Sequence, residues 1–254
     1  MRGLLVGSPI LTAGCIFVYD FDALEGPAAE DAGAVDSAVD AIGSDVERSD
    51  AGGAPCGAGA GLLTCTGFDD ASAPFNGWTV GPSSSGASAL VTTTSSQSPP
   101  ASLEFKVPSG SGAAADAFIE QRVRNAGDHF AVQMGVFLVQ VPSGAAGQLL
   151  IVGDQNQGGR VRVTAAGSVI EEAPGYTLRG TLGTPPTGSW LTLRMEIDFG
   201  TKRGKVTLGG ASADFDIASE PPTGGMLIRL GLKDVDATSG AWTSRVDDLF
   251  IETL

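Results

Sequence analysis

The stretch Trp-Leu-Thr-Leu-Arg-Met-Glu-Ile-Asp, residues 190–198, alternates apolar and polar side chains along most of its length. Successive side chains of a β-strand point to opposite faces of the sheet, so Leu191, Leu193, Met195 and Ile197 share one face. The pattern therefore predicts a half-buried strand that covers a hydrophobic core with one face and meets water with the other.

Similar short runs, separated by clusters of Gly, Pro and Ser, fill the chain from residue 62 to the C terminus. The predicted strands are 62–68, 89–93, 102–107, 117–124, 129–139, 148–152, 160–164, 168–172, 190–197, 205–208, 213–217, 226–232 and 245–252. The composition of 37 Gly and only 17% charged residues suits a chain of strands and turns better than a helical one. We therefore predict an all-β fold, a two-sheet antiparallel β-sandwich.

The N-terminal residues have the layout of an export signal. A positively charged start and an apolar run precede the small residues before Cys15. This resembles the lipobox of bacterial lipoproteins, which implies a signal peptide over residues 1–14 and a lipid on Cys15. Ordinary secretion, a buried first strand and a start that truncates a longer signal remain as alternatives. Gly7, Ser8 and Pro9 interrupt the apolar run, so a membrane-spanning helix is not expected.

Residues 15–55 read as an acidic, low-complexity tether. Between Cys15 and Asp50 ten acidic residues stand against Arg48 alone, and the whole chain has a formal net charge of -14. Such a segment lacks the apolar residues needed to fold, so a disordered spacer is expected. The absence of a basic surplus argues against nucleic-acid binding, and membrane association is expected through the lipid anchor only. The expected location is the cell envelope, as an outer-membrane or cell-surface lipoprotein, with secretion as the alternative.

The two remaining cysteines, Cys56 and Cys65, open the predicted sandwich domain of residues 56–254. In an exported protein they are expected to form a disulfide, with two reduced buried thiols as the alternative. A zinc site is disfavoured, because His129 is the only histidine in the chain.

Several short motifs in residues 56–254 share an order along the chain. They are Gly67-Phe68-Asp69-Asp70, Trp78, Ser98 to Leu103, Gly188-Ser189-Trp190, Lys205 to Leu208, Leu230-Gly231-Leu232 and Val246 to Ile251. Together they resemble the concanavalin A-like lectin and glucanase jelly roll of the laminin-G-like type. The resemblance implies that the first and last strands lie together, with Phe68 and Phe250 in the core.

If the terminal strands pair, four carboxylates meet at their ends. These are Asp69, Asp70, Asp247 and Asp248. Jelly rolls of this kind often hold one structural Ca²⁺, and calcium prefers six to eight oxygen ligands. One structural calcium ion is therefore the only cofactor predicted; solvated acids or contacts to Arg245 are the alternative.

Catalytic motifs are incomplete. Glu196-Ile197-Asp198 is similar to the Glu-x-Asp-x-Glu strand of jelly-roll glucanases, but Gly200 stands where the third acid would be. The sequence contains no nucleophile motif, such as Gly-x-Ser-x-Gly, for which His129 could act as the base. No catalytic residue is therefore assigned, and a non-enzymatic protein is expected.

Candidate sugar-binding residues are Trp242, as an aromatic platform, and Asp154 and Asn156 in a polar loop. The leading hypothesis is a surface-anchored, monomeric module that binds a glycan or another envelope component. The alternatives are a structural or adhesive envelope protein without a small ligand and a glycoside hydrolase.

Overall fold

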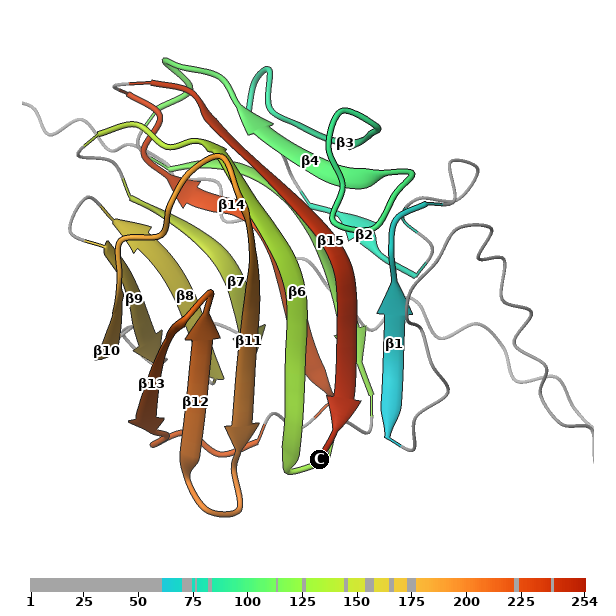
Figure 1. The fold of residues 1–254 in the computed structure, drawn as a ribbon. Coiled ribbons are helices and arrows are strands. Elements are labelled where there is room, and N and C mark those ends of the chain that lie inside the picture. The colour runs from blue at the N-terminus through green and yellow to red at the C-terminus, as the bar shows by residue number, and fades with distance from the viewer. Residues whose placement is uncertain are drawn as a thin grey trace, which may run out of the picture. The chain divides into compact units, whose positions relative to one another are not determined.

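The computed structural model describes residues 61–254, except 70–74, 76, 82–83, 113, 125–126, 144–145, 154–157, 165–166, 173–176, 222–223 and 239. The described chain is all-β (Figure 1). Its strands are β1 (Leu62–Thr66), β2 (Thr79–Val80), β3 (Ser88–Thr92), β4 (Ser102–Val107), β5 (Ala115–Val123), β6 (His129–Gln140), β7 (Gly147–Gly153), β8 (Gly158–Thr164), β9 (Gly167–Glu172), β10 (Thr177–Gly183), β11 (Trp190–Asp198), β12 (Arg203–Leu208), β13 (Ala211–Asp216), β14 (Met226–Val235) and β15 (Trp242–Thr253). The described residues contain no helix that is long and apolar enough to span a membrane.

The strands form two antiparallel sheets. Sheet A has the order β13-β12-β11-β6-β15-β4-β3, and β1 pairs with the C-terminal half of β15. Sheet B has the order β10-β9-β8-β7-β14-β5-β2. Figure 1 shows the two sheets as layers, with β12, β11, β6 and β15 side by side in one of them. The predicted two-sheet sandwich is confirmed, and the first and last strands lie together as expected.

The core lies between the sheets and follows from the alternation in the sequence. In β11 the residues Leu193, Met195 and Ile197 have at most 1% of their surface exposed to solvent. The intervening polar residues lie on the opposite, outer face of sheet A, where they are partly exposed or exposed. The predicted half-buried strand is confirmed, and the same strand supplies polar side chains to the surface.

A β-bulge in β15 changes which residues reach the core. The register of β15 against β6 shifts between Asp247 and Phe250, and Asp248 has a positive φ of 48°. One extra residue in a strand reverses the faces of all residues beyond it. Leu249 and Ile251 are therefore buried, whereas Phe250 faces outward and stays partly exposed. The prediction that Phe250 enters the core is wrong, while Phe68 is buried as expected, with 2% exposure.

Residues 95–101, here called the strap, cross part of the outer face of sheet A. Trp190 Nε1 donates a hydrogen bond to Ser95 Oγ (3.2 Å), which ties the strap to β11. The Gln97 side chain lies over Gly135 of β6, where an added Cβ would come within 1.8 Å of Gln97 Oε1. The glycine thus lets the strap lie close to the sheet. Among the described residues, the strap leaves a pocket at the end of this face near the β11–β12 turn.

Several predictions fall outside the described residues: the signal peptide over 1–14, the lipidated Cys15, the tether over 15–55, Cys56, Asp70, Asp154 and Asn156. Cys65 takes part in a disulfide bond. Its pairing with Cys56 stays a prediction, as does the domain boundary at residue 56.

Candidate functional site on the outer face of sheet A

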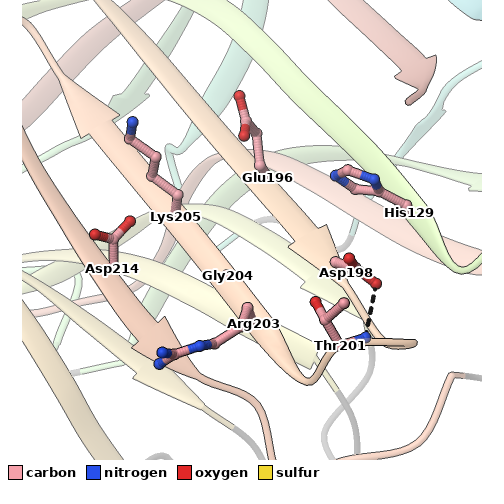
Figure 2. Close-up of a pocket in the computed structure, with 8 residues that line it drawn as sticks. All are labelled: His129, Glu196, Asp198, Thr201, Arg203, Gly204, Lys205 and Asp214. Atoms are coloured by element: carbon pink, nitrogen blue, oxygen red, sulfur yellow. Dashed lines mark hydrogen bonds between the residues drawn. The ribbon is translucent and has the colours of Figure 1, made fainter.

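A pocket of about 330 Å³ opens on the outer face of sheet A beside the β11–β12 turn (Figure 2). Its volume lies at the lower end of the range of small-molecule pockets. The lining residues are His129, Glu196, Asp198, Thr201, Arg203, Gly204, Lys205 and Asp214. Apart from Thr201 and Gly204, all of these carry an ionisable side chain.

Strand register brings these side chains together. Asp198 of β11 lies directly opposite His129 of β6 on one side and Arg203 of β12 on the other. One step along the strands, Glu196 lies opposite Lys205, which in turn lies opposite Asp214 of β13. Directly opposed side chains in a sheet have Cβ atoms about 5 Å apart, so each row forms a line of interacting groups.

The carboxylate of Asp198 is fixed by the turn that follows it. The Thr201 backbone N–H donates a hydrogen bond to Asp198 Oδ1 (3.0 Å), as Figure 2 shows. Hydrogen bonds from the Thr201 side chain and backbone lower the pKa of Asp198, and the nearby His129 imidazole lowers it further. Asp198 is therefore a stable anion beside the imidazole.

The carboxylate of Glu196 is fixed from its other side. Arg194 Nε donates to Glu196 Oε1 (2.7 Å), and Arg194 Nη1 donates to Glu252 Oε1 (2.9 Å). Burial acts to lower the pKa of the Arg194 guanidinium, but its bonds to the two glutamates outweigh burial and raise that pKa. One guanidinium thus holds two carboxylates, Glu196 and Glu252, which flank Ala131 in the same transverse row.

Other pocket groups are uncommitted. Among the described residues, no hydrogen bond or ion pair engages the side chains of His129, Lys205 or Asp214. Figure 2 shows His129 on the side of the pocket next to Glu196 and Asp198, with Lys205 and Asp214 on the side toward β13. An imidazole and two carboxylates facing one space can supply acid–base catalysis, and the free ammonium and carboxylate can bind ligand hydroxyls.

The outer face of sheet B also carries charges, but they satisfy one another. Arg229 pairs with Glu120 and Arg160 pairs with Glu171, both at 2.6 Å. A crevice lined by Phe118, Gln148 and Lys233, among others, is much smaller than the pocket on sheet A. Of these two hollows, the one on sheet A is therefore the larger, and its described lining holds the uncommitted groups.

The predicted sugar platform at Trp242 is wrong. Trp242 is fully buried, and its Nε1 donates to the Asp236 carbonyl oxygen (2.8 Å) within the protein. The other predicted sugar-binding residues, Asp154 and Asn156, lie outside the described residues. The sequence placed Glu196 and Asp198 on one face correctly, but it did not reveal that His129 lies opposite Asp198, because strand pairing over that separation leaves no local pattern.

The structure brings three of the four predicted calcium ligands to the strap. Asp247 Oδ2 accepts backbone N–H bonds from Gln97 (2.8 Å) and Ser98 (3.0 Å), and Asp248 Oδ1 accepts from Ser98 Oγ. Asp69 Oδ1 accepts from the backbone N–H of Ala101 (2.9 Å). These carboxylates hold the strap in place.

Burial raises the pKa of Asp247 to about 7, although the strap amides act to lower it. Among the described residues, no group of three His, Cys, Asp or Glu is placed to hold a metal ion. Asp70 lies outside those residues, and the calcium site stays a prediction.

Comparison with known proteins concerns the fold. No family model and no curated protein sequence matches the chain. Among solved structures, an endo-β-1,4-glucuronan lyase from the fungus Trichoderma reesei has a TM-score of 0.59 at 12% identity, over 76% of this chain and 96% of the lyase. The cellulose-induced protein Cip1 has a TM-score of 0.58 at 12% identity, over 75% of this chain and 97% of Cip1. The receptor-binding domain of botulinum neurotoxin type G has a TM-score of 0.52 at 10% identity, over 77% of this chain and 49% of the neurotoxin chain.

These matches define the class: the chain has a β-sandwich jelly-roll fold, consistent with the concanavalin A-like type. The prediction of a non-enzymatic protein is wrong. That prediction depended on incomplete catalytic motifs, but a polysaccharide lyase shares this fold, so the missing motifs do not argue against catalysis.

Proposed function

We propose that this chain is a polysaccharide-cleaving enzyme and that the pocket on the outer face of sheet A is its active site. One observation carries the proposal: β6 and β11 place His129, Glu196 and Asp198 around a single open pocket, where their polar atoms face the same space. The Glu-x-Asp-x-Glu pattern lacks its third acid in this chain, where Gly200 takes that place. His129 supplies a third titratable group from the neighbouring strand instead.

Each group has a role that its surroundings favour. Asp198 lies directly opposite His129 in the strand register, so its carboxylate places a negative charge beside the imidazole. Glu196 is held by Arg194 and presents its carboxyl group to the pocket. His129 and Glu196 are then the pair that exchanges protons with the substrate and with water.

The comparisons support polysaccharide as the substrate class. One protein with this fold cleaves glucuronan and another is induced by cellulose, as their names state. Both align over nearly their whole length, so the similarity involves the complete sandwich. For this chain we propose only the general substrate class, polysaccharide, and neither glucuronan nor cellulose in particular.

Two sequence-based expectations complete the proposal. The Cys15 lipid anchor and the acidic tether would hold the enzyme at the cell envelope. A structural Ca²⁺ at Asp69, Asp70, Asp247 and Asp248 would brace the strap. Dialysis against a chelator should then lower the melting temperature, and added calcium should restore it.

The test is turnover of a panel of neutral and acidic polysaccharides by the full chain, followed by the release of reducing ends. His129→Ala and Glu196→Gln should each reduce cleavage by about 100-fold or more, the usual size of a general acid–base contribution. Glu120→Gln, which removes a similarly exposed charge from sheet B, is the matched control and should retain full activity. Cleavage that survives both pocket substitutions would contradict the proposal.

A further inference from the structure

Phe250 is an outward-facing aromatic residue close to the pocket. The bulge in β15 turns its ring onto the outer face of sheet A, opposite Gln133 of β6. Gln133 accepts a hydrogen bond from Arg194 (3.3 Å), the residue that also holds Glu196 at the pocket. On its other side Phe250 lies opposite Cys65 of β1. Within the part of the chain that the structure describes, no ring contact or cation–π contact engages Phe250.

The contrast with Phe137, on the same face of β6, is informative. Phe137 packs edge-on against Trp190 and lies under the guanidinium of Arg245. Because Trp190 and Arg245 contact its ring, Phe137 faces outward but is not available to stack on a ligand. Phe250 has no such aromatic or cationic partner among the described residues, although a partly exposed aromatic ring on a polar face is costly to leave against water. The partly exposed side of the ring, between Gln133 and Cys65, is therefore the apolar surface that can stack on a ligand.

Phe250 lies two strands from β11, so its ring is about 10 Å across the sheet from the pocket wall. An extended oligosaccharide can cover that distance, with one sugar unit in the pocket and another on the ring. Glu252, two residues further along β15 on the same face, adds hydrogen-bond acceptors between the two positions.

The charge on this open part of sheet A is negative. Its acids are Glu196, Asp198, Asp214, Asp216 and Glu252, and its bases are Arg194, Arg203 and Lys205, which leaves five negative against three positive charges. Arg194 is bound to two of the acids, and Arg203 is bound to Asp216. A polyanion would meet repulsion here, with little free positive charge to offset it.

From these observations we infer that the substrate is a neutral polysaccharide whose chain runs from the pocket to a stacking position on Phe250. The inference rests on the proposed function and narrows it. It also separates this chain from the uronate chemistry of the lyase that shares its fold.

A neutral substrate excludes cleavage by elimination, and hydrolysis is the reaction that the acid–base groups of the pocket can then perform. Elimination needs a carboxyl group beside the carbon that loses its proton, and a neutral sugar has none. In hydrolysis water adds to the anomeric carbon as the glycosidic C–O bond breaks. The leaving oxygen receives a proton from an acidic group, and the attacking water gives one up to a basic group. The acid then lacks a proton and the base carries an extra one, and proton exchange with solvent water restores both groups.

The experiment uses polysaccharides that share a backbone but differ in charge. The full chain is run in native gels that contain hydroxyethylcellulose or carboxymethylcellulose, and xylan or glucuronoxylan. Retardation gives the affinity, and the same samples are assayed for reducing ends. We expect a neutral member to bind at least about tenfold more tightly than its charged counterpart. Added salt should strengthen only the binding of the charged member, because salt screens repulsion.

Phe250→Ala should weaken binding of the neutral polysaccharide by about tenfold, and Phe250→Trp should restore it. Leu90→Ala, which removes an exposed apolar side chain from β3 in the same sheet, is the control and should bind like the wild type. Melting temperatures of all variants show that each is folded.

Tighter binding or cleavage of the charged members would overturn the neutral class and leave the proposed function standing. Binding that is insensitive to Phe250→Ala would overturn the stacking position. Neither binding nor cleavage of any polysaccharide in the panel would overturn the proposed function and this inference with it.

Discussion

His129 and Asp198 lie directly opposite each other across the β6–β11 pair, each at the end of its strand. The pairing puts the single imidazole of the chain beside a carboxylate that the following turn keeps ionised. Most of what we propose for the pocket depends on this relationship.

The titration of Asp198 tests the pairing. Thr201→Ala should raise the pKa of Asp198 toward its ordinary value, because it removes the side-chain hydrogen bond that contributes most to the lowering. His129→Ala should raise the pKa by a smaller amount, since the imidazole is a weaker cause. Carboxyl carbon chemical shifts measured against pH give both values. No change in His129→Ala would show that the two side chains do not interact.

The stability of the domain should depend on Asp247. Its pKa of about 7 exceeds that of an aspartate in the unfolded chain, so the folded state binds this proton more tightly. The contribution is fully present below about pH 4 and is lost as the pH rises through 7, up to about 4 kcal/mol in all.

Urea unfolding between pH 5 and pH 8 measures this effect, with a chelator present so that no Ca²⁺ occupies the site proposed at Asp247. The wild type should lose stability over the range, whereas Asp247→Asn, which does not titrate, should lack this component. Parallel curves for the two proteins would contradict the assignment to Asp247.

Gly204 supports the floor of the pocket. A Cβ at this position would lie 2.2 Å from the Phe215 ring, so Gly204→Ala forces that buried ring to move. We expect a loss of about 1–3 kcal/mol in unfolding free energy, measured by denaturant titration. Gly210→Ala, at a position with no atom within 4 Å, is the control and should be close to neutral. Equal effects of the two substitutions would argue against the observed packing.

Trp242 should contribute to stability and not to binding. Trp242→Phe removes the hydrogen bond from Nε1 to the Asp236 carbonyl oxygen and leaves a small void. The expected cost is about 1–3 kcal/mol of unfolding free energy. Affinity for polysaccharide, measured in the same native gels, should not change; a folded variant with reduced affinity would return Trp242 to the candidate site.

The sequence predicted the architecture because local alternation carries it. The pattern in residues 190–198 alone identifies which side chains are buried, and the structure agrees at Leu193, Met195 and Ile197. The same alternation predicted the wrong face for Phe250. One additional residue at the bulge reverses the faces of the residues beyond it, and no short sequence pattern marks the bulge.

The site was harder to predict than the fold. Glu196 and Asp198 could be placed on one face from their spacing, but the approach of His129 depends on pairing between strands more than 60 residues apart. The prediction of Trp242 as a sugar-binding residue was wrong because aromatic residues near turns occur both in the core and at the surface. Its burial follows from the register of β15, which the sequence leaves open.

The most direct test of the central claim is to map where a bound saccharide perturbs the protein. Amide chemical shifts of the isotope-labelled chain would be recorded during titration with a neutral oligosaccharide. We predict that the shifts change at His129, from Glu196 to Lys205 and around Phe250, all on sheet A. Changes confined to the outer face of sheet B, around Arg229 and Arg160, would contradict the assignment of the pocket as the active site.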